Sequence, residues 1–543
     1  MRPETDHPVI MIVLNDVEHD NRVIKCAQLL EDIGYPVTIF GLSNDRTLEK
    51  PVLKSIAGLN VRLFPNPRFV ISNAPVRAFN WEATISLLIA AMWTHFEEAK
   101  PAILHTHDFN ALKIGQALAL RARRNGQPVY WVHDFHEYVA GLTTIDDDIR
   151  RAGLVHQDDA IHLPDQLITV SPQLSDALQR DYGLRRGPSV ILNSNSLRSF
   201  NPDHGDTIRK RTGMDSSIPL AVYTGGVSQP RGVHTLVETL GLIPEMHVAL
   251  ITNNTGAYVD SLKAIADAHM APQRLHFMPY VLPGEVPSFV QDATVGVHPM
   301  VHFQNAEVAL PNKLFDYCLA RVPSVVSDCK AMSEFVREWG FGEVFRAEDA
   351  GDLAAALRKI FATRDQYTAP LQGESHFLNL VAWEAQCERL EALYAKARLE
   401  IANTADQDNW RGLRRSDEGQ EILPIHVKDK SKSADQKLEN LPPAYAGALL
   451  RIEDNYLVGW AQDNNNPSRP VKIELLYRNE KILEGRTGVT LAEHLPSVAP
   501  NSGFRLELPR MFRDGKARKL ALRIVSTVVI LKGTPLNVTA HEQ

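Results

Sequence analysis

The sequence predicts an α/β protein with two successive parallel-sheet domains and a small all-β domain at its end. Three observations carry this prediction. Short apolar runs alternate with helical patterns through the first 380 residues, the alternation restarts after a polar stretch near residue 200, and about the last hundred residues show period-two patterns instead. Near-continuous apolar strands separated by helices are typical of parallel sheets that are covered on both faces.

The first domain, residues 1–200, opens with a strand and a helix. Residues 9–14 (VIMIVL) form a continuous apolar run, and residues 23–33 then carry apolar side chains at helical spacing up to Gly34. Four further apolar runs, separated mostly by helical segments such as 111–124, are predicted as strands at 102–105, 129–133, 167–170 and 189–192.

The second domain, residues 201–380, repeats this pattern. Its predicted strands are 220–223, 248–251, 275–278, 295–297 and 324–326, again with helices between them. Two Rossmann-like domains in tandem leave a cleft at the carboxyl ends of their strands, where ligands of such folds bind. We expect a closing helix at 381–403.

The rest of the chain changes in character. Residues 404–440 are rich in Asp, Lys, Ser and Gln and are typical of a solvated linker. Residues 441–543 contain alternating runs at 471–477, 503–508 and 519–525, which predict a small β-sandwich.

Composition narrows the class of protein. The 543 residues are 44% hydrophobic, enough for several cores, and the net charge of -7 argues against nucleic acid as a partner. The four cysteines show no CxxC spacing, so neither a disulfide framework nor a zinc site is expected. We find no signal-peptide pattern and no apolar run of roughly 20 residues. We therefore expect a cytoplasmic protein, and a peripheral contact with the inner face of the membrane stays open.

The loop after the first strand is not a dinucleotide fingerprint. It reads NDVEHDNR over residues 15–22, without the G-x-G-x-x-G of such sites. Its acidic residues would repel a polyphosphate, so it is better suited to an uncharged polyol, or Asp20 simply caps the following helix.

The second domain offers better anion-binding groups. Its first strand is followed by Gly225 and Gly226, and Arg231 lies just before the next helix. Backbone N–H groups of such a loop and a fixed positive charge suit a phosphate. Lys313, at the start of a helix in the segment LPNKLFDY, opposes the helix dipole, which a local anion would explain; a solvated surface lysine is the alternative.

These segments resemble a known family. The stretches VYTGGVSQPRGVHTLVETL and LPNKLFDYCLARVPSVVSD, together with LHTHDFNAL, VYWVHDFHEY, LITVSPQLSDAL and VILNSNSL in the first domain, resemble retaining glycosyltransferases of family 4, which have the GT-B fold. The resemblance covers roughly residues 9–400 and rests on the order and spacing of the motifs. It implies two Rossmann-like domains facing a cleft, with a nucleotide-sugar donor on the second domain and a glycan or lipid-linked acceptor on the first.

The resemblance also implies residue roles. Arg231 and Lys313 would hold the donor diphosphate, with Gly225, Gly226 and Asn312 beside it, and Asp316 would bind the ribose hydroxyls. His133, at the end of its predicted strand, would lie near the reaction centre. His136-Glu137 also echoes a His-Glu pair of the family, and a hydrogen-bonded histidine at the cleft edge is the alternative for His133.

Two positions depart from the family pattern. The family's first motif glutamate would fall at Val308, and Glu307 lies one residue earlier; the position of a common arginine after the first loop glycine is Gly226. An enzyme that builds bacterial surface polysaccharide or glycoconjugates remains the main hypothesis. The alternatives are a non-catalytic glycan-binding homologue and a nucleotide-sugar epimerase on the same fold.

The resemblance implies no metal and no cofactor, because the nucleotide sugar is a substrate. Asp146-Asp147-Asp148 and His105-x-His107-Asp108 could be taken as metal motifs, but a solvated turn and hydrogen bonding at the cleft explain them better. Near residue 460, the segment YLVGWA resembles a GWA-type β-sandwich domain attached to bacterial glycosyltransferases. Trp460 there is either a core residue or a platform for a sugar ring.

Overall fold

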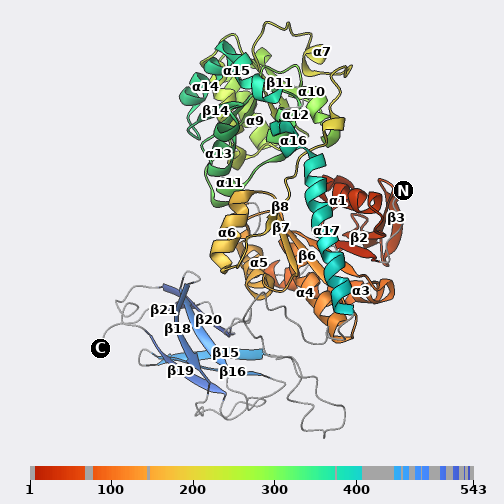
Figure 1. Cartoon of the computed structure of the whole chain (residues 1–543). Helices are drawn as coiled ribbons and strands as arrows, with labels where there is room; N and C mark the ends of the chain where they lie inside the picture. The colour runs from red at the N-terminus through yellow and green to blue at the C-terminus, as the bar shows by residue number, and fades with distance from the viewer. Residues whose placement is uncertain are drawn as a thin grey trace. The chain divides into compact units, whose positions relative to one another are not determined.

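The computed structural model divides into two compact units, residues 1–424 and 425–543 (Figure 1). We describe each unit by itself. The residues that the structure describes are 7–67, 77–143, 147–372, 376–405, 445–453, 456–463, 471–477, 480–487, 502–508, 518–524, 531 and 536–538. The predicted linker at 404–440 therefore lies outside the described residues, apart from its first two.

An eight-stranded sheet forms the core of the first domain. Its order is β3-β4-β2-β1-β5-β6-β7-β8, and every neighbouring pair is parallel except the edge pair β3–β4. The strands are β1 (Val9–Ile12), β2 (Val37–Leu42), β3 (Val52–Ile56), β4 (Leu59–Phe64), β5 (Ile103–His107), β6 (Tyr130–Phe135), β7 (Gln166–Thr169) and β8 (Ser189–Val190). The sequence analysis missed β3 and β4, whose alternating burial is that of an edge hairpin.

Helices cover both faces of this sheet. One face packs against the helices α3 (Arg77–Ala99), α4 (Asp108–Arg124), α5 (Asp147–Ala160) and α6 (Pro172–Tyr182). The other face packs against α1 (Asn21–Asp32) and α17 (Trp383–Ala405). Asp20 caps α1, because its carboxylate accepts a hydrogen bond from the Val23 N–H at 3.1 Å.

A six-stranded parallel sheet forms the core of the second domain. Its order is β11-β10-β9-β12-β13-β14, and its strands are β9 (Leu220–Thr224), β10 (His247–Ile251), β11 (Leu275–Met278), β12 (Val295–His298), β13 (Ser324–Ser327) and β14 (Gly342–Phe345). In both sheets the strand order reverses beside the first strand, as in doubly wound folds.

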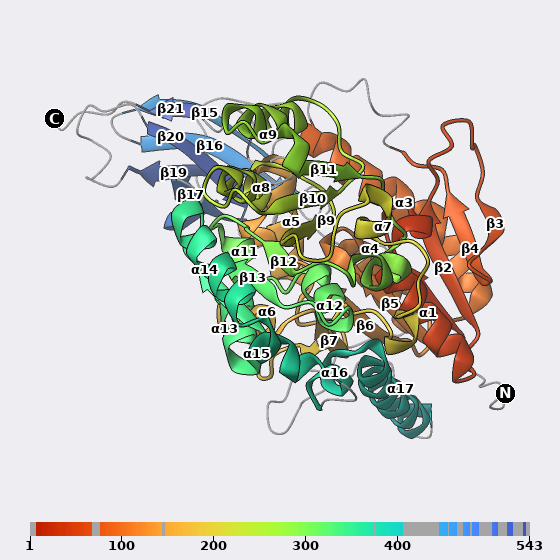
Figure 2. The same cartoon turned by 90° about the horizontal axis from the view of Figure 1, so that it is seen from above.

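The helices of the second domain also form two layers. One layer is α8 (Val233–Glu238), α9 (Ala257–Ala268) and α14 (Ala350–Ala362). The other contains α7 (Ile208–Thr212), α10 (Val286–Val290), α12 (Asn312–Leu319), α13 (Lys330–Trp339) and α16 (His376–Val381), with the short α11 (Gln304–Val308) at its rim and α15 (Arg364–Thr368) after α14. Figure 2 shows this layering from above.

Helix α17 returns from the second domain to the first. Trp383 at its start and Tyr394 in its middle belong to the core of the first sheet, where the Tyr35 hydroxyl donates to the Tyr394 carbonyl at 3.2 Å. The predicted closing helix therefore completes the first domain. None of the described helices is both long enough and apolar enough to cross a membrane.

The second unit consists of two small antiparallel sheets. Their orders are β15-β16-β19 and β18-β17-β20-β21, with strands β15 (Tyr445–Glu453), β16 (Tyr456–Asp463), β17 (Lys472–Tyr477), β18 (Glu480–Arg486), β19 (Gly503–Glu507), β20 (Arg518–Ile524) and β21 (Leu536–Val538). Side chains from both sheets share one apolar core, as in a sandwich. Trp460 on β16 is partly buried and lies outside that core.

Candidate functional site

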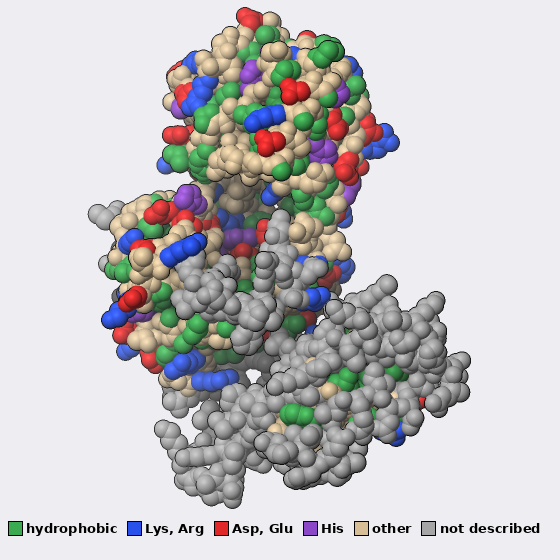
Figure 3. All heavy atoms as spheres, turned by 180° about the vertical axis from the view of Figure 1, so that it is seen from behind, with side chains coloured by type: hydrophobic (Ala, Val, Ile, Leu, Met, Phe, Trp, Pro, Cys, Tyr) green, Lys and Arg blue, Asp and Glu red, His purple; other side chains and the backbone are tan. Residues whose placement is uncertain are grey.

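A cavity of about 500 Å³ lies between the two Rossmann-like domains. Thr224 and Ile251 line it from the carboxyl ends of β9 and β10, and polar groups reach it from both domains. On the face drawn in Figure 3, a deep recess separates the two domains, with basic and histidine side chains inside it. The position agrees with the rule that ligands of open α/β sheets bind outside the carboxyl ends of the strands.

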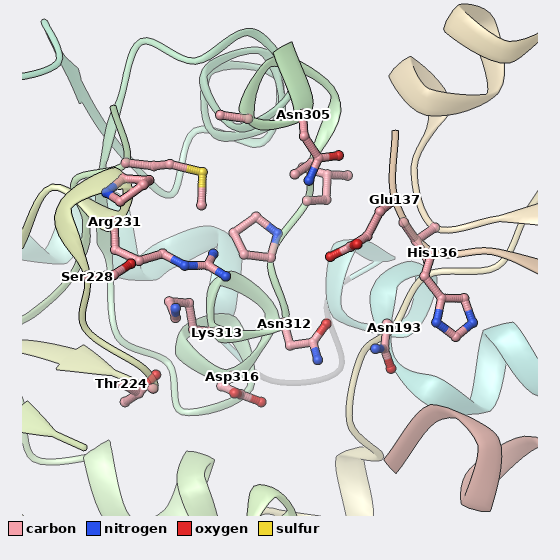
Figure 4. A pocket seen from close by; sticks show the side chains of 18 of the residues that line it. His136, Glu137, Asn193, Thr224, Ser228, Arg231, Asn305, Asn312, Lys313 and Asp316 are labelled. Carbon is pink, nitrogen blue, oxygen red and sulfur yellow. The ribbon is translucent and has the colours of Figure 1, made fainter. Parts of the chain in front are cut away.

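Arg231 reaches into the cavity from the loop after β9. It ends the short helix η4 (Gln229–Arg231) and is followed by Gly232, whose φ is 65°. A Cβ atom on Gly232 would lie 1.8 Å from the Pro299 carbonyl oxygen, so the loop can take this course only with glycine there. The guanidinium points to the middle of the cavity (Figure 4).

Lys313 stands beside Arg231 in the first turn of α12. Its ammonium lies 3.3 Å from the Tyr223 hydroxyl and 4.6 Å from the centre of the Tyr223 ring. A Cβ on Gly225 would lie 3.4 Å from Lys313 Nζ, so the glycine leaves the backbone open next to the cation. Desolvation and the Arg231 charge hold the pKa of Lys313 well below its usual value.

Neither cation of this wall is neutralised by the protein. Among the residues that the structure describes, no carboxylate lies within 4.0 Å of the Arg231 or Lys313 side-chain nitrogens. Two like charges held together without a counter-charge disfavour each other. An anion in the cavity would remove this repulsion.

Asp316 lies one turn further along α12, at the floor of the cavity. It is 7% exposed, and its carboxylate accepts a hydrogen bond from Asn195 Nδ2 at 2.7 Å. Burial raises the pKa of Asp316 to about 7, against the opposing effects of Asn195, Lys25 and Lys313. Lys25 anchors the segment that carries Asn195, because its ammonium donates to the Ser194 carbonyl at 2.5 Å.

The first-domain wall corrects the expectation for His133. This residue is fully buried inside β6, its Nδ1 lies 2.7 Å from the Thr106 hydroxyl, and it is not among the residues that line the cavity. Strand β6 does not end at His133, since Phe135 still pairs with Thr169 of β7. His136 lies just beyond the true end of the strand and lines the cavity instead.

An ion-pair network holds His136 in place. Asp134 is buried and receives two hydrogen bonds from the Arg22 guanidinium, at 2.7 and 3.0 Å. His107 Nδ1 and His136 Nε2 each lie 3.3 Å from the same carboxylate. Burial opposes a charge on His136, but the Asp134 carboxylate raises its pKa.

Two groups of potential metal ligands occur among the described residues, and neither lines the cavity. The first is His105, His107 and Asp134, where Arg22 already occupies both Asp134 oxygens. The second is His302, Glu307 and Cys329 on the far side of α11. Of the acidic run predicted as a solvated turn, Asp146 lies outside the described residues and α5 begins at Asp147.

Glu137 is a site residue that the sequence analysis did not single out. It lines the cavity directly after His136, and its carboxylate points towards Arg231 from the opposite wall (Figure 4). Burial and the neighbouring Asp108 carboxylate raise the pKa of Glu137 to about 7. The only signal in the sequence was the His-Glu pair directly after an apolar strand.

The altered motif is visible in the geometry of α11. Val308 lines the cavity, whereas Glu307 is not among the lining residues. The Glu307 carboxylate lies 2.6 Å from His302 Nδ1 and accepts a hydrogen bond from the Lys330 N–H at 2.9 Å. Of the binding residues expected from the sequence, Gly225, Arg231, Asn312, Lys313 and Asp316 line the cavity, and Gly226 does not.

The two domains touch at one edge of the cavity. The Tyr138 N–H donates to Asn305 Oδ1 at 2.8 Å, and the Ser171 hydroxyl donates to the Val308 carbonyl at 2.5 Å. Gly141, in the short helix η2 (Val139–Gly141), packs so closely on α11 that a Cβ there would lie 2.3 Å from Asn305 N. We call these contacts between residues 138–141, Ser171 and α11 the domain latch.

Two family models match the part of the chain that forms this site. "Glycosyltransferase Family 4" matches residues 21–193, and "Glycosyl transferases group 1" matches residues 218–363. A curated relative, D-inositol 3-phosphate glycosyltransferase of Geodermatophilus obscurus, is 21% identical over 402 residues, which are 70% of this chain and 85% of the relative.

Solved structures share the fold at low identity. Sucrose-phosphate synthase from Thermosynechococcus elongatus superposes with a TM-score of 0.59 at 17% identity, over 73% of this chain and 100% of that one. The trehalose-6-phosphate structure from E. coli, bound with UDP-2-fluoro glucose, has a TM-score of 0.54 at 11% identity, over 72% of this chain and 98% of that one. With its two parallel-sheet domains, its cavity between them and these matches, the chain belongs to the glycosyltransferases of the GT-B type.

Proposed function

We propose that this protein transfers a sugar from a nucleoside-diphosphate donor to a hydroxyl group of a glycan or lipid-linked acceptor. One observation carries the proposal: Arg231 and Lys313 meet in the cavity without any described carboxylate as an ion-pair partner. A diphosphate supplies the negative charge that this wall lacks. A charge-assisted hydrogen bond of this kind contributes about 1.5–3 kcal/mol.

The other lining groups fit the remaining parts of such a donor. Asp316, fixed by Asn195, is suited to accept hydrogen bonds from the ribose hydroxyls. Asn312 and the backbone at Gly225 lie beside the two cations and would reach phosphate or sugar. Val281, Pro283 and Val286 form an apolar part of the wall that suits the flat base. Near the transferred sugar, His136 takes the place that the sequence analysis gave to His133.

The chemistry would proceed as follows. The bond between the anomeric carbon and the diphosphate oxygen breaks, the acceptor oxygen forms the new bond, and the acceptor proton leaves with the released diphosphate. Arg231 and Lys313 stabilise the negative charge that develops on the leaving group. We propose attack on the face from which the diphosphate departs, hence retention, and neutralisation by these cations without a metal.

The biological setting is part of the proposal. The resemblance to family 4 supports a role in bacterial surface polysaccharide or glycoconjugate synthesis, with a peripheral membrane contact where the acceptor is lipid-linked. UDP is the first donor nucleotide to test, because a structural neighbour is bound with UDP-2-fluoro glucose.

Calorimetric titration with UDP, GDP, ADP and their glucose conjugates tests the donor site. We expect one nucleotide to bind, and we expect Arg231→Ala and Lys313→Ala each to weaken its binding roughly 10- to 150-fold, the equivalent of one charge-assisted hydrogen bond. Arg337→Ala is the matched control, since Arg337 is exposed in the same domain and does not line the cavity. Absence of binding by every nucleotide would overturn the donor-site assignment.

A second candidate is a glycan-binding homologue without catalysis. Val308 favours it, because the expected motif carboxylate is missing from the cavity wall. Incubation with the donor that binds, followed by detection of free nucleotide, separates the two. Release of nucleotide that depends on Lys313 supports the enzyme, whereas glycan binding without any nucleotide binding supports the homologue.

A further inference from the structure

The cavity is electrically polarised between its two walls. The second-domain wall carries Arg231 and Lys313. On the first-domain side, four carboxylates surround His136, and each of them interacts with it electrostatically or by a short contact: Asp20, Asp108, Asp134 and Glu137. The charge of this side therefore differs in sign from that of the opposite wall.

The cations on the first-domain side do not balance these carboxylates. Arg22 is the one arginine or lysine among the described first-domain residues that line the cavity, and its guanidinium is committed to Asp134 and the Ile191 carbonyl. His107 stays neutral, because burial lowers its pKa. Only His136 remains to offset Asp20, Asp108 and Glu137.

Glu137 is the member of this group that a ligand would meet. Its side chain points into the cavity, and no described cation lies within 4.0 Å of it. The domain latch fixes its backbone, since the next residue, Tyr138, donates its N–H to Asn305 of the second domain. The space between Glu137 and Arg231 is therefore bounded by an acceptor of hydrogen bonds on one side and a cation on the other.

We propose that the acceptor substrate is uncharged and rich in hydroxyl groups, and that Glu137 selects it over a phosphorylated sugar. The proposal rests on the proposed function and concerns the wall opposite the donor. A hydroxyl group donates a hydrogen bond to the Glu137 carboxylate, whereas a phosphate placed there meets uncompensated negative charge. Relatives with phosphate in their names, such as D-inositol 3-phosphate glycosyltransferase and sucrose-phosphate synthase, provide the contrast.

The test compares matched acceptors with the nucleotide sugar identified by calorimetry. Glucose is paired with glucose 6-phosphate and with glucose 6-sulfate, and inositol with inositol 3-phosphate; transfer products and hydrolysed donor are measured together. We expect the wild type to use or bind each neutral member with at least tenfold higher kcat/KM than its charged partner. In Glu137→Gln this preference should fall at least tenfold, mainly through a lower KM for the charged members.

Glu18→Gln is the matched control, because Glu18 is an exposed glutamate of the same domain that does not line the cavity. It should keep the wild-type preference. The preference for glucose over glucose 6-sulfate should also weaken below pH 7, where Glu137 takes up a proton beside Asp108, His136 and Arg231, while Asp20 and Asp134 stay ionised. The sulfate keeps its charge over this range, so the trend reports the protein.

Three results would overturn the proposal. They are equal or better use of the charged members by the wild type, a preference that Glu137→Gln leaves unchanged, and no product or altered donor hydrolysis with any pair while the donor still binds. If no nucleotide sugar binds at all, the failure belongs to the proposed function instead.

Discussion

Lys313 shows how one residue reports the ligand for which a site is built. A lysine that is enclosed beside an arginine has little reason to be there for stability, because desolvation and like charge both act against its proton. The cost is recovered when an anion arrives. Strongly perturbed groups in a cleft are for this reason functional candidates.

Nucleotide binding should therefore be coupled to proton uptake. The diphosphate restores the pKa of Lys313 towards 10.5, so at pH values between its lowered free-protein pKa and 10.5 the complex binds more protons than its components. Calorimetry at pH 8.5 in buffers of different ionisation enthalpy measures this uptake.

Lys313→Met should lose most of the uptake along with part of the affinity, whereas Arg337→Ala should keep both. Equal apparent enthalpies in all buffers for the wild-type protein would contradict a neutralised Lys313.

Sequence reasoning found Arg231 and Lys313 because each has a local signal: a cation beside a glycine loop or at a helix start. Glu137 had only the His-Glu pair, and its meaning depends on the opposite wall. His133 was placed at the wrong end of its strand for a similar reason. The length of β6 is set by pairing of Phe135 with Thr169, a contact between residues 34 positions apart that no local pattern contains.

Among the elements, α11 shows the consequence of a shift by one residue. A helix turns by about 100° per residue, so exchanging neighbours moves a side chain from one face to another. Here the carboxylate faces His302 and the N-terminus of α13, and Val308 faces the cavity. The sequence revealed the shift; only the structure shows the new partners of the carboxylate.

Glu307→Gln should consequently change kcat/KM by less than about threefold, a difference of roughly 0.6 kcal/mol. Its interaction with His302 is half-exposed and contributes on the order of 1 kcal/mol at most to stability. Steady-state rates and thermal melting of the variant check both values. Asp316→Asn, on the neighbouring α12, is the comparison and should weaken donor binding at least tenfold; a loss of that size in Glu307→Gln would show that the carboxylate does act in the reaction.

At the scale of the whole catalytic unit, the domain latch links closure of the cavity to the position of Glu137. Gly141 leaves no space for a side chain against the backbone of α11. The two domains and their order were predictable from the repeated strand-helix pattern, but the latch was not, because it joins residues 138–141 to residues 304–308 across the cleft.

Gly141→Ala should open the cavity. The added methyl group must displace α11 or separate the domains, at a cost of about 1–3 kcal/mol, so kcat/KM should fall roughly 5- to 150-fold while nucleotide affinity changes less. Rates, calorimetry and small-angle X-ray scattering of the nucleotide complex measure these effects. Gly205→Ala provides the control, since a Cβ there meets nothing within 4 Å; an unchanged rate in Gly141→Ala would show that closure is not needed.

The course of α17 has a consequence for how the chain is made. The first domain begins at β1 but its core is completed by Trp383, Leu390 and Tyr394, whose hydroxyl lies 2.9 Å from His105 Nδ1 in the middle of β5. The whole second domain is therefore an insertion between the body of the first domain and its last helix. During synthesis the second domain can fold as a unit while one face of the first sheet still lacks α17, so the order of completion reverses the order of the sequence.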